Sequence, residues 1–191
     1  MDPSVARHCT FCGARLGSRP DPDGGRRCPS CSRRTYANPK PAVEVALLGP
    51  DGQILMVRRA VDPHRGLLDL PGGFVEVGET VDDALRREVT EETGLAGRDL
   101  SDLAFTGSVV SPYEFEGVVH DVLVLQHVGR YRGTPVAGDD AAEITRALPE
   151  HLAREDMAFP DLHLALMAIA LADEGRGSRS PARSSLLHGH A

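Results

Sequence analysis

Six carboxylates, not counting the one at position 76, lie between Gly72 and Leu95, with only two arginines among them. On a helical wheel, Glu88, Glu91 and Glu92 share the side that carries the apolar residues, so they are expected to face the protein. Like charges three or four residues apart each cost roughly 0.2–0.5 kcal/mol, and partial burial raises this cost. A hard divalent cation such as Mg²⁺ or Mn²⁺ would balance them, whereas one arginine would not. The pattern predicts a metal-binding helix, and a solvated acidic helix is the alternative.

The chain carries a second group of potential metal ligands near its start. Cys9-x-x-Cys12 and Cys28-x-x-Cys31 are separated by fifteen residues, a spacing typical of structural zinc. Two disulfides are the rival interpretation, which a cytoplasmic location disfavours. A closed four-cysteine site is structural, so this zinc is not expected to take part in a reaction. The small ribbon around it could bind nucleic acid or a partner, pack on its neighbour or stabilise a dimer.

The elements that position these residues follow from periodicity and end signals. The acidic helix is expected from Val81 to Thr93, with Thr80 and Asp83 as a capping-box-like start and Gly94 as a left-handed stop. A closing helix is expected at residues 161–175, with its first residue, an aspartate, as candidate cap. Strands are expected at residues 42–49, 53–59, 67–70, 103–110, 118–128 and 143–148. This order favours an α/β fold in which helices cover a sheet.

Length and composition bound the remaining possibilities. The 191 residues allow one domain with a small appendage, and we expect a zinc ribbon at 1–36, an α/β domain at 37–174 and a disordered tail at 175–191. The net charge of −7 disfavours general binding to nucleic acid. No apolar run is long enough to span a bilayer, so no membrane partner is expected. The first residues lack the apolar core of a signal peptide, which predicts a cytoplasmic protein.

The acidic segment resembles the Nudix box at every defined position, from Gly73 and Glu79 to the run REVTEETGL at residues 87–95. The resemblance implies a Nudix hydrolase, an α/β/α sandwich with a mixed sheet that cleaves nucleoside diphosphates linked to another group. In this family the loop and helix hold Mg²⁺ against a pyrophosphate. Metal ions neutralise the phosphate charge and lower the pKa of bound water, and a carboxylate then accepts the proton.

The same resemblance assigns roles to individual residues. Arg87 and Glu79 are expected to orient the carboxylates. Glu91 is the first candidate for the general base. Glu143 and Asp140 are alternatives, because some members of the family use a downstream glutamate, although a solvated loop explains both equally well. The expected metal ligands are the Gly73 carbonyl and the carboxylates of Glu88, Glu91 and Glu92.

Further resemblances bear on which substrate is cleaved. A ribbon before a Nudix domain resembles the NADH pyrophosphatases, yet the SQPWPFP-type motif of those enzymes is missing here. The segments at 35–48 and 58–79 are more similar to the ADP-ribose and FAD pyrophosphatase type, and a homodimer is expected from this resemblance. We therefore expect a Mg²⁺-dependent pyrophosphohydrolase that releases AMP and a phosphorylated product. The alternatives are an NAD(H) pyrophosphatase, an NAD-cap RNA hydrolase and, from another class, a non-catalytic nucleotide sensor or adaptor.

Substrate contacts are expected outside the box. Arg58 and Arg59 end a strand near the expected phosphate site, and Glu143 is the third candidate contact. Tyr113 could stack on a base together with the aromatic residue two positions later, or both could lie on a surface hairpin. Phe159 is expected to pack under the last helix rather than flank a base. The histidines at 64 and 120 are expected to be surface or strand residues.

Overall fold

The computed structural model describes residues 7–17, 19–22, 24–115, 117–138 and 141–174. The predicted tail at 175–191 and the candidate base Asp140 lie outside these residues. The elements, in chain order, are β1 (Arg26–Arg27), β2 (Arg34–Thr35), β3 (Lys40–Leu48), β4 (Ile54–Arg59), β5 (Leu68–Asp69), β6 (Gly72–Phe74), α1 (Val81–Thr93), β7 (Leu100–Phe115), β8 (Val118–Tyr131), β9 (Ala141–Ala147) and α2 (Pro160–Glu174), with 3₁₀ turns at Gly97–Asp99, Pro149–His151 and Arg154–Asp156.

A mixed sheet forms the centre of the larger part of the chain. Its order is β5-β4-β3-β8-β7, with β6 pairing to β3 and β9 pairing to β4. β3 runs parallel to β8 and antiparallel to β6 and β4. Between its pairings with β6 and β4, the N–H of Val45 donates to the Pro71 carbonyl, at 3.0 Å. This hydrogen bond holds the segment that leads into α1 against the middle of the sheet. The predicted strands and the predicted mixed sheet are confirmed.

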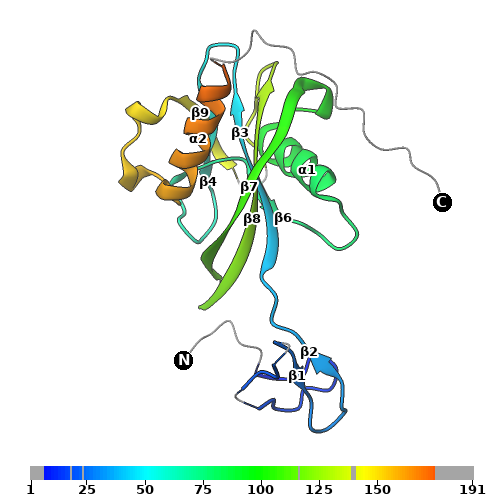
Figure 1. Cartoon of the computed structure of the whole chain (residues 1–191). Helices are drawn as coiled ribbons and strands as arrows, with labels where there is room; N and C mark the ends of the chain where they lie inside the picture. The colour runs from blue at the N-terminus through cyan, green and yellow to red at the C-terminus, as the bar shows by residue number, and fades with distance from the viewer. Residues whose placement is uncertain (1–6, 18, 23, 116, 139–140, 175–191) are drawn as a thin grey trace, which may run out of the picture.

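The two long helices cover opposite faces of this sheet (Figure 1). Side chains alternate along β3, so that Val43 and Val45 pack with α1 while Ala46 and Leu48 pack with α2. Burial on both faces explains why β3 reads as a nearly continuous apolar run. Each large apolar side chain buried in this way contributes roughly 1.5–3 kcal/mol. The predicted α/β/α sandwich is confirmed.

The ends of α1 agree with the sequence prediction. The Thr80 hydroxyl accepts from the Asp83 N–H, and the Asp83 carboxylate accepts from the Thr80 N–H, which completes a capping box. Gly94 closes the helix with φ 67°, a left-handed conformation that glycine adopts without steric cost. The boundaries of the acidic helix were therefore encoded locally.

The buried face of α1 differs from the helical-wheel prediction. Thr93 is fully buried, and its hydroxyl donates to the Val89 carbonyl. Glu91, expected on the protein side, is exposed. The reason is that α1 packs on the sheet through the row Leu85, Val89 and Thr93, spaced four residues apart. The glutamates lie at the edge of this row rather than on it.

The start of α2 also needs a correction. The helix begins at Pro160, so Asp161 lies in its first turn and is not the cap. Its carboxylate pairs instead with the Arg154 guanidinium, at 2.5 Å. Proline is favourable in the first turn because the N–H that it lacks has no partner within the helix.

The N-terminal ribbon is a separate small unit, joined to the sheet through the residues before β3 (Figure 1). Its strands β1 and β2 pair only over Arg26↔Thr35 and Arg27↔Arg34. Its buried cluster consists of Cys9, Leu16 and Cys28, with Ala14 and Cys31 as partly buried neighbours. This core is too small to stabilise a fold by itself. Among the described residues, no helix has both the length and the apolar character to cross a membrane.

Candidate active site

Strand β6, which precedes α1, brings backbone and carboxylates together. A Cβ at Gly72 (φ 157°) would lie 2.2 Å from the Val43 carbonyl oxygen, so the close pairing of β6 with β3 requires glycine there. A Cβ at Gly73 would lie 2.4 Å from Oε1 of Glu88. The sheet thus presents a bare stretch of backbone against which a carboxylate of α1 rests. Gly73 and Glu88, two of the predicted ligands, therefore lie next to each other.

Arg87 joins three of the predicted carboxylates. Its guanidinium donates to Glu79 at 2.7 and 2.9 Å, to Glu88 at 2.8 Å and to Glu91 at 3.0 Å. A further bond, at 3.0 Å, reaches the Phe74 carbonyl in the chain before the helix. Hydrogen bonding to Glu79 is the main cause that raises the pKa of Arg87, so the guanidinium is permanently charged. The geometry is that of a residue that orients carboxylates.

Glu92 is the glutamate of α1 whose carboxylate contacts the backbone of β6. One of its oxygens accepts from the Gly72 N–H at 3.1 Å. Burial raises its pKa well above the usual value, and the nearby charges of Asp69 and Glu88 raise it further. The pKa of Glu88 is also raised by burial, although Arg87 partly offsets this. A bound cation would stabilise two desolvated carboxylates beside the glycines of β6, so the donor set fits Mg²⁺ or Mn²⁺.

A cavity of about 760 Å³ opens beside β6. That volume suits a ligand of nucleotide size. Its walls combine carboxylates, one arginine and aromatic rings. Charged, aromatic and glycine residues of the lining include Lys40, Glu44, Arg59, Asp69, Gly73, Phe74, Glu76, Glu88, Glu92, Tyr113, Phe115, His120 and Phe159.

The two predicted arginines point in different directions. Arg59 lines the cavity, where it donates to Asp69 at 2.6 Å and to the Tyr113 hydroxyl at 3.2 Å. Arg58 instead donates to Glu143 at 3.0 Å, and neither residue is part of the cavity lining. Successive side chains of a strand alternate between faces, and the pairing with β9 also shifts between Arg58 and Arg59. The structure therefore brings Arg59 to the site and leaves the Arg58–Glu143 pair outside it.

An aromatic wall faces the carboxylates. Tyr113 stacks on Phe159, with ring centroids 6.1 Å apart, and meets Phe74 edge-on at 5.7 Å. Phe159 also contacts His64 at 5.0 Å. Phe159 was expected only to pack under α2; it does so and also lines the cavity, because it immediately precedes the first turn of that helix. His120 lines the cavity too, which its sequence context did not indicate.

Three polar residues beneath the cavity were missed. Glu44 lies in the middle of β3, Asp69 ends β5, and His163 lies in α2, and all three are buried. Each interrupts an apolar run in the sequence. A charged residue in such a run is the one signal that could have identified them, because burial of a charge requires a partner.

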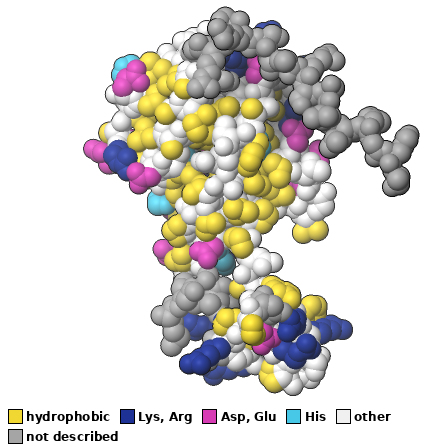
Figure 2. Space-filling model, in the orientation of Figure 1, with side chains coloured by type: hydrophobic (Ala, Val, Ile, Leu, Met, Phe, Trp, Pro, Cys, Tyr) yellow, Lys and Arg dark blue, Asp and Glu magenta, His cyan; other side chains and the backbone are white. Residues whose placement is uncertain are grey.

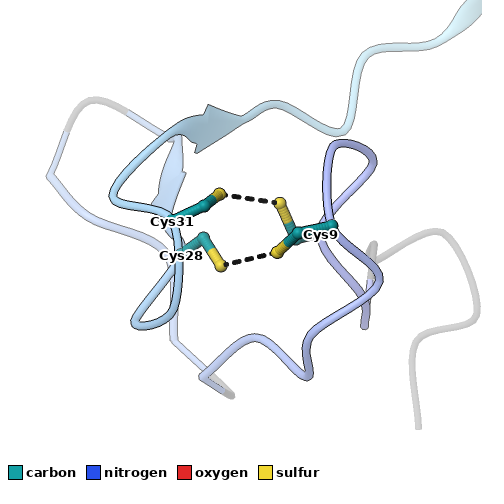
Figure 3. Close-up of side chains that lie close together, drawn as sticks. Cys9, Cys28 and Cys31 are labelled. Atoms are coloured by element: carbon teal, nitrogen blue, oxygen red, sulfur yellow. Dashed lines mark hydrogen bonds between the residues drawn. The ribbon is translucent and has the colours of Figure 1, made fainter.

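The four cysteines converge in the ribbon. The Sγ atoms of Cys9 and Cys31 lie 3.7 Å apart, and those of Cys12 and Cys28 lie 3.6 Å apart. All four thiols are free and lie within 4.8 Å of one another (Figure 3). A tetrahedral zinc with Zn–S bonds of about 2.3 Å places its sulfurs about 3.8 Å apart, so the cluster fits a structural metal. Disulfides, with S–S near 2.05 Å, do not fit this spacing.

Comparison with known proteins agrees with this geometry. The NUDIX domain profile matches residues 38–166. The chain belongs to the NUDIX family. It is 40% identical over 110 residues to the ADP-ribose pyrophosphatase of Methanocaldococcus jannaschii, a match that covers 58% of this chain and 62% of that protein.

Two further similarities place this NUDIX protein among its relatives. It is 38% identical over 61 residues to the NAD-capped RNA hydrolase NUDT12 of Homo sapiens, covering 32% of this chain and 13% of that protein. Its fold is similar to that of a NUDIX hydrolase from Nitrosomonas europaea, with a TM-score of 0.60 and 21% identity over 90% of this chain and 94% of the other. The chain spans less than two thirds of the length of both curated relatives.

Acid is expected to weaken the Arg87 network of this NUDIX domain. The pKa of Glu79 is lowered to about 2, first by its hydrogen bonds from Arg87 and then by the Glu76 N–H. A carboxylate of this kind stabilises the fold above its ordinary pKa of 4.5 and loses that contribution as the pH falls toward 2. Glu79→Gln should therefore lower the Tm at pH 7, and its difference from wild type should shrink between pH 4.5 and 3. Circular dichroism melts would contradict this if the difference stayed constant.

Proposed function

We propose that this protein is a Mg²⁺-dependent pyrophosphohydrolase that cleaves the diphosphate of a nucleoside diphosphate-linked small molecule, such as ADP-ribose or FAD. The products are AMP and a phosphorylated second product. The observation that carries the proposal is the cavity itself, in which the half-buried Glu92, the Gly73 backbone, Arg59 and the aromatic wall face one space. Cation ligands, a phosphate contact and a stacking surface are the three features that such a substrate needs.

The chain's own residues have separate tasks in this proposal. Glu88, Glu91, Glu92 and the Gly73 carbonyl hold Mg²⁺, which supplies charge neutralisation of the diphosphate and a lowered pKa of bound water. Arg87 and Glu79 keep the carboxylates oriented, as their hydrogen bonds indicate. The Glu91 carboxylate is exposed and, among the described residues, accepts a hydrogen bond only from Arg87; in this proposal it also accepts the proton of the attacking water.

The comparison with the M. jannaschii ADP-ribose pyrophosphatase supports the substrate class. The stacked rings of Tyr113 and Phe159 provide a flat surface for a base, and Phe115 extends the same aromatic wall. Arg59 is within reach of the space between this wall and the carboxylates. A non-catalytic sensor is a weaker alternative, because all four predicted metal ligands are present and Glu88 and Glu92 face the cavity.

Arg59 and Arg58 form a matched pair for testing the phosphate contact. Arg59→Gln is expected to raise KM for ADP-ribose by about tenfold or more, because a charge-assisted hydrogen bond is lost. Arg58→Gln is expected to have a clearly smaller effect, since Arg58 pairs with Glu143 outside the cavity. Steady-state kinetics on both variants decide the matter, and a larger effect at Arg58 would reverse the assignment.

The proposal is tested by product analysis. Purified protein with Mg²⁺ is incubated with ADP-ribose, FAD, NADH, NAD⁺ and diadenosine polyphosphates, with Glu92→Gln as the inactive control. Release of AMP from ADP-ribose or FAD ahead of the other compounds supports the proposal and selects its substrate. A preference for NADH would favour the NAD(H) pyrophosphatase alternative, and no turnover of any compound would reject the small-molecule activity.

A second candidate function is the removal of an NAD-type cap from RNA. The observation in its favour is the ribbon, where residues 7–36 contain seven arginines and two aspartates although the whole chain has a net charge of −7. These arginines gather on the ribbon in Figure 2, and the Arg33 guanidinium stacks over Phe11, which is 56% exposed. Arginine and exposed aromatic rings together suit single-stranded RNA. A salt-sensitive RNA affinity that is lost on deletion of residues 1–35 would support this function.

The ribbon is also the basis of our proposal for domain organisation. We propose that residues 1–36 form a zinc ribbon and residues 37–174 form the NUDIX hydrolase domain. The tight thiol cluster supports it, and so does the small apolar core, in which Leu16 is the one buried apolar side chain besides cysteines among the described ribbon residues. The zinc is structural in this proposal, because four cysteines leave no open coordination position for a substrate.

A further inference from the structure

A buried ionic network lies next to the cavity, on the side of α2. His163 is fully buried, and its Nε2 lies 3.0 Å from Oδ1 of Asp69 and 3.6 Å from Oε2 of Glu44. The other oxygen of Asp69 accepts from Arg59 at 2.6 Å. Among the described residues, neither ring nitrogen of His163 has an aligned hydrogen-bond partner, so charge attraction dominates these contacts. His163 itself is not part of the cavity lining, whereas the other three residues are.

The network needs a second cation. Two carboxylates against Arg59 alone would leave one negative charge uncompensated, and Glu92 adds a repulsive charge near Asp69. Burial by itself lowers the pKa of His163, but Asp69 and then Glu44 outweigh this and raise it. Burial likewise opposes the charge of Asp69, yet His163 and Arg59 together lower its pKa. An imidazolium at His163 therefore balances the network.

Glu44 has a further partner that fixes its position. Gln126 of β8 donates to its Oε1 at 2.7 Å, while Oε2 faces His163. Burial nevertheless raises the pKa of Glu44. The groups that face His163 are thus Glu44 from β3, Arg59 from β4 and Asp69 from β5, with Glu92 of α1 acting on Asp69 from further away.

This balance matters for an anionic ligand. Carboxylates dominate the charged residues of the cavity wall, and among the described residues its lysine and arginine cations are Lys40 and Arg59. If Arg59 had to neutralise Asp69 alone, little of its positive field would reach a ligand. A charged His163 on the opposite oxygen of Asp69 shares the neutralisation of this carboxylate with Arg59. It also fixes the position of the Asp69 carboxylate, which holds the Arg59 guanidinium in place.

We propose that His163 is a positioning residue that acts through Asp69 on Arg59 and so sets the affinity of the cavity for the anionic part of its substrate without touching it. The inference rests on the proposed function, because it assumes that the diphosphate binds in this cavity. It adds a residue of α2, far from the acidic helix in sequence, to the determinants of substrate affinity.

The test compares ligands with and without phosphate. Affinity for ADP-ribose is measured by calorimetry in EDTA, where turnover is prevented, for the wild type, His163→Gln, Arg59→Gln and the double variant. His163→Gln is expected to weaken binding about tenfold in the wild-type background and less than about twofold in the Arg59→Gln background. Adenosine, which carries no phosphate, should bind His163→Gln and wild type equally.

His127→Gln provides a matched control. His127 is also a buried histidine, but it lies on β8 against the Leu125 carbonyl and Phe105, outside the cavity lining. Its replacement should leave the ADP-ribose affinity unchanged. Equal losses from His163→Gln in both backgrounds, or an equal loss for adenosine, would show that His163 only supports the packing of α2 and would overturn the inference.

A measurement on the wild type covers the case in which His163→Gln does not fold. Nitrogen NMR of the His163 ring at pH 7 should show both ring nitrogens protonated, and ADP-ribose affinity should fall as the ring loses its proton at higher pH. A neutral ring at pH 7 would overturn the inference. A charged ring in a protein that neither binds nor cleaves ADP-ribose would instead reject the proposed substrate and leave the charge balance of the network standing.

Discussion

Replacement of Glu92 with glutamine is expected to lower kcat by on the order of a hundredfold or more while the fold is retained. Glu92 is largely buried, lines the cavity, and has the Gly72 N–H as its hydrogen-bond donor. Among the described residues the Glu92 carboxylate forms no ion pair, so it can bind a cation. An amide is a much weaker ligand for Mg²⁺ than a carboxylate, so the substitution removes the group that couples the cation to the cavity.

The stability of the same variant gives a second, independent readout. Burial raises the pKa of Glu92, so without metal its ionised form is disfavoured in the fold and its contribution is lost as the pH rises through the raised value. Glutamine carries no charge to desolvate. In EDTA at pH 8 the Tm of Glu92→Gln should thus equal or exceed that of wild type. With Mg²⁺ only the wild type should gain stability, because a ligand stabilises the state that binds it.

Asp82→Asn is the matched control for this experiment. Asp82 is an exposed carboxylate of the same helix that pairs with Arg86, away from the cavity. Its turnover and its Mg²⁺-dependent Tm should follow the wild type. Near-normal rates in both Glu91→Gln and Glu92→Gln would reject the assignment of the acidic helix as the metal site.

Replacement of Cys28 with serine is expected to remove zinc and unfold the ribbon. Cys28 is 1% exposed, and its Sγ lies 3.6 Å from that of Cys12. Structural zinc contributes about 10–16 kcal/mol of apparent binding energy in small domains, far more than the few buried side chains here can replace. Elemental analysis should find one zinc per wild-type chain and none in the variant. Limited proteolysis should then cleave within residues 7–36.

Ser30→Ala is the control for the cysteine variant, since Ser30 is exposed between Cys28 and Cys31. It should keep its zinc and its protease resistance. Turnover of ADP-ribose by the residual NUDIX domain distinguishes a purely structural ribbon, which leaves kcat near the wild-type value, from a ribbon that contributes to the site. A reduced wild-type protein without zinc would contradict the metal assignment.

Local sequence was sufficient for the features that depend on near neighbours. The ends of α1 follow from Thr80, Asp83 and Gly94, whose effects act within four residues. Each Cys-x-x-Cys turn places two thiols on one short loop, which is why the spacing predicted a metal cluster, whereas the approach of the two turns to each other, with Cys9 3.7 Å from Cys31, depends on the fold of the ribbon. The box residues Gly73 and Glu88 also meet as expected, because a short turn and the first turns of one helix connect them.

Tertiary structure decided the features that depend on residues from distant segments. Arg59 rather than Arg58 faces the cavity because β4 pairs with β9 in one particular register, and a shift of one residue would exchange the two. The contact of His163 with Asp69 and Glu44 exists only because α2 packs across the sheet over strands more than ninety positions earlier in the chain. Side-chain direction in a sheet and contact across layers are properties of the folded chain, which is why the sequence alone specified the acidic helix but not the other residues that line the cavity beside it.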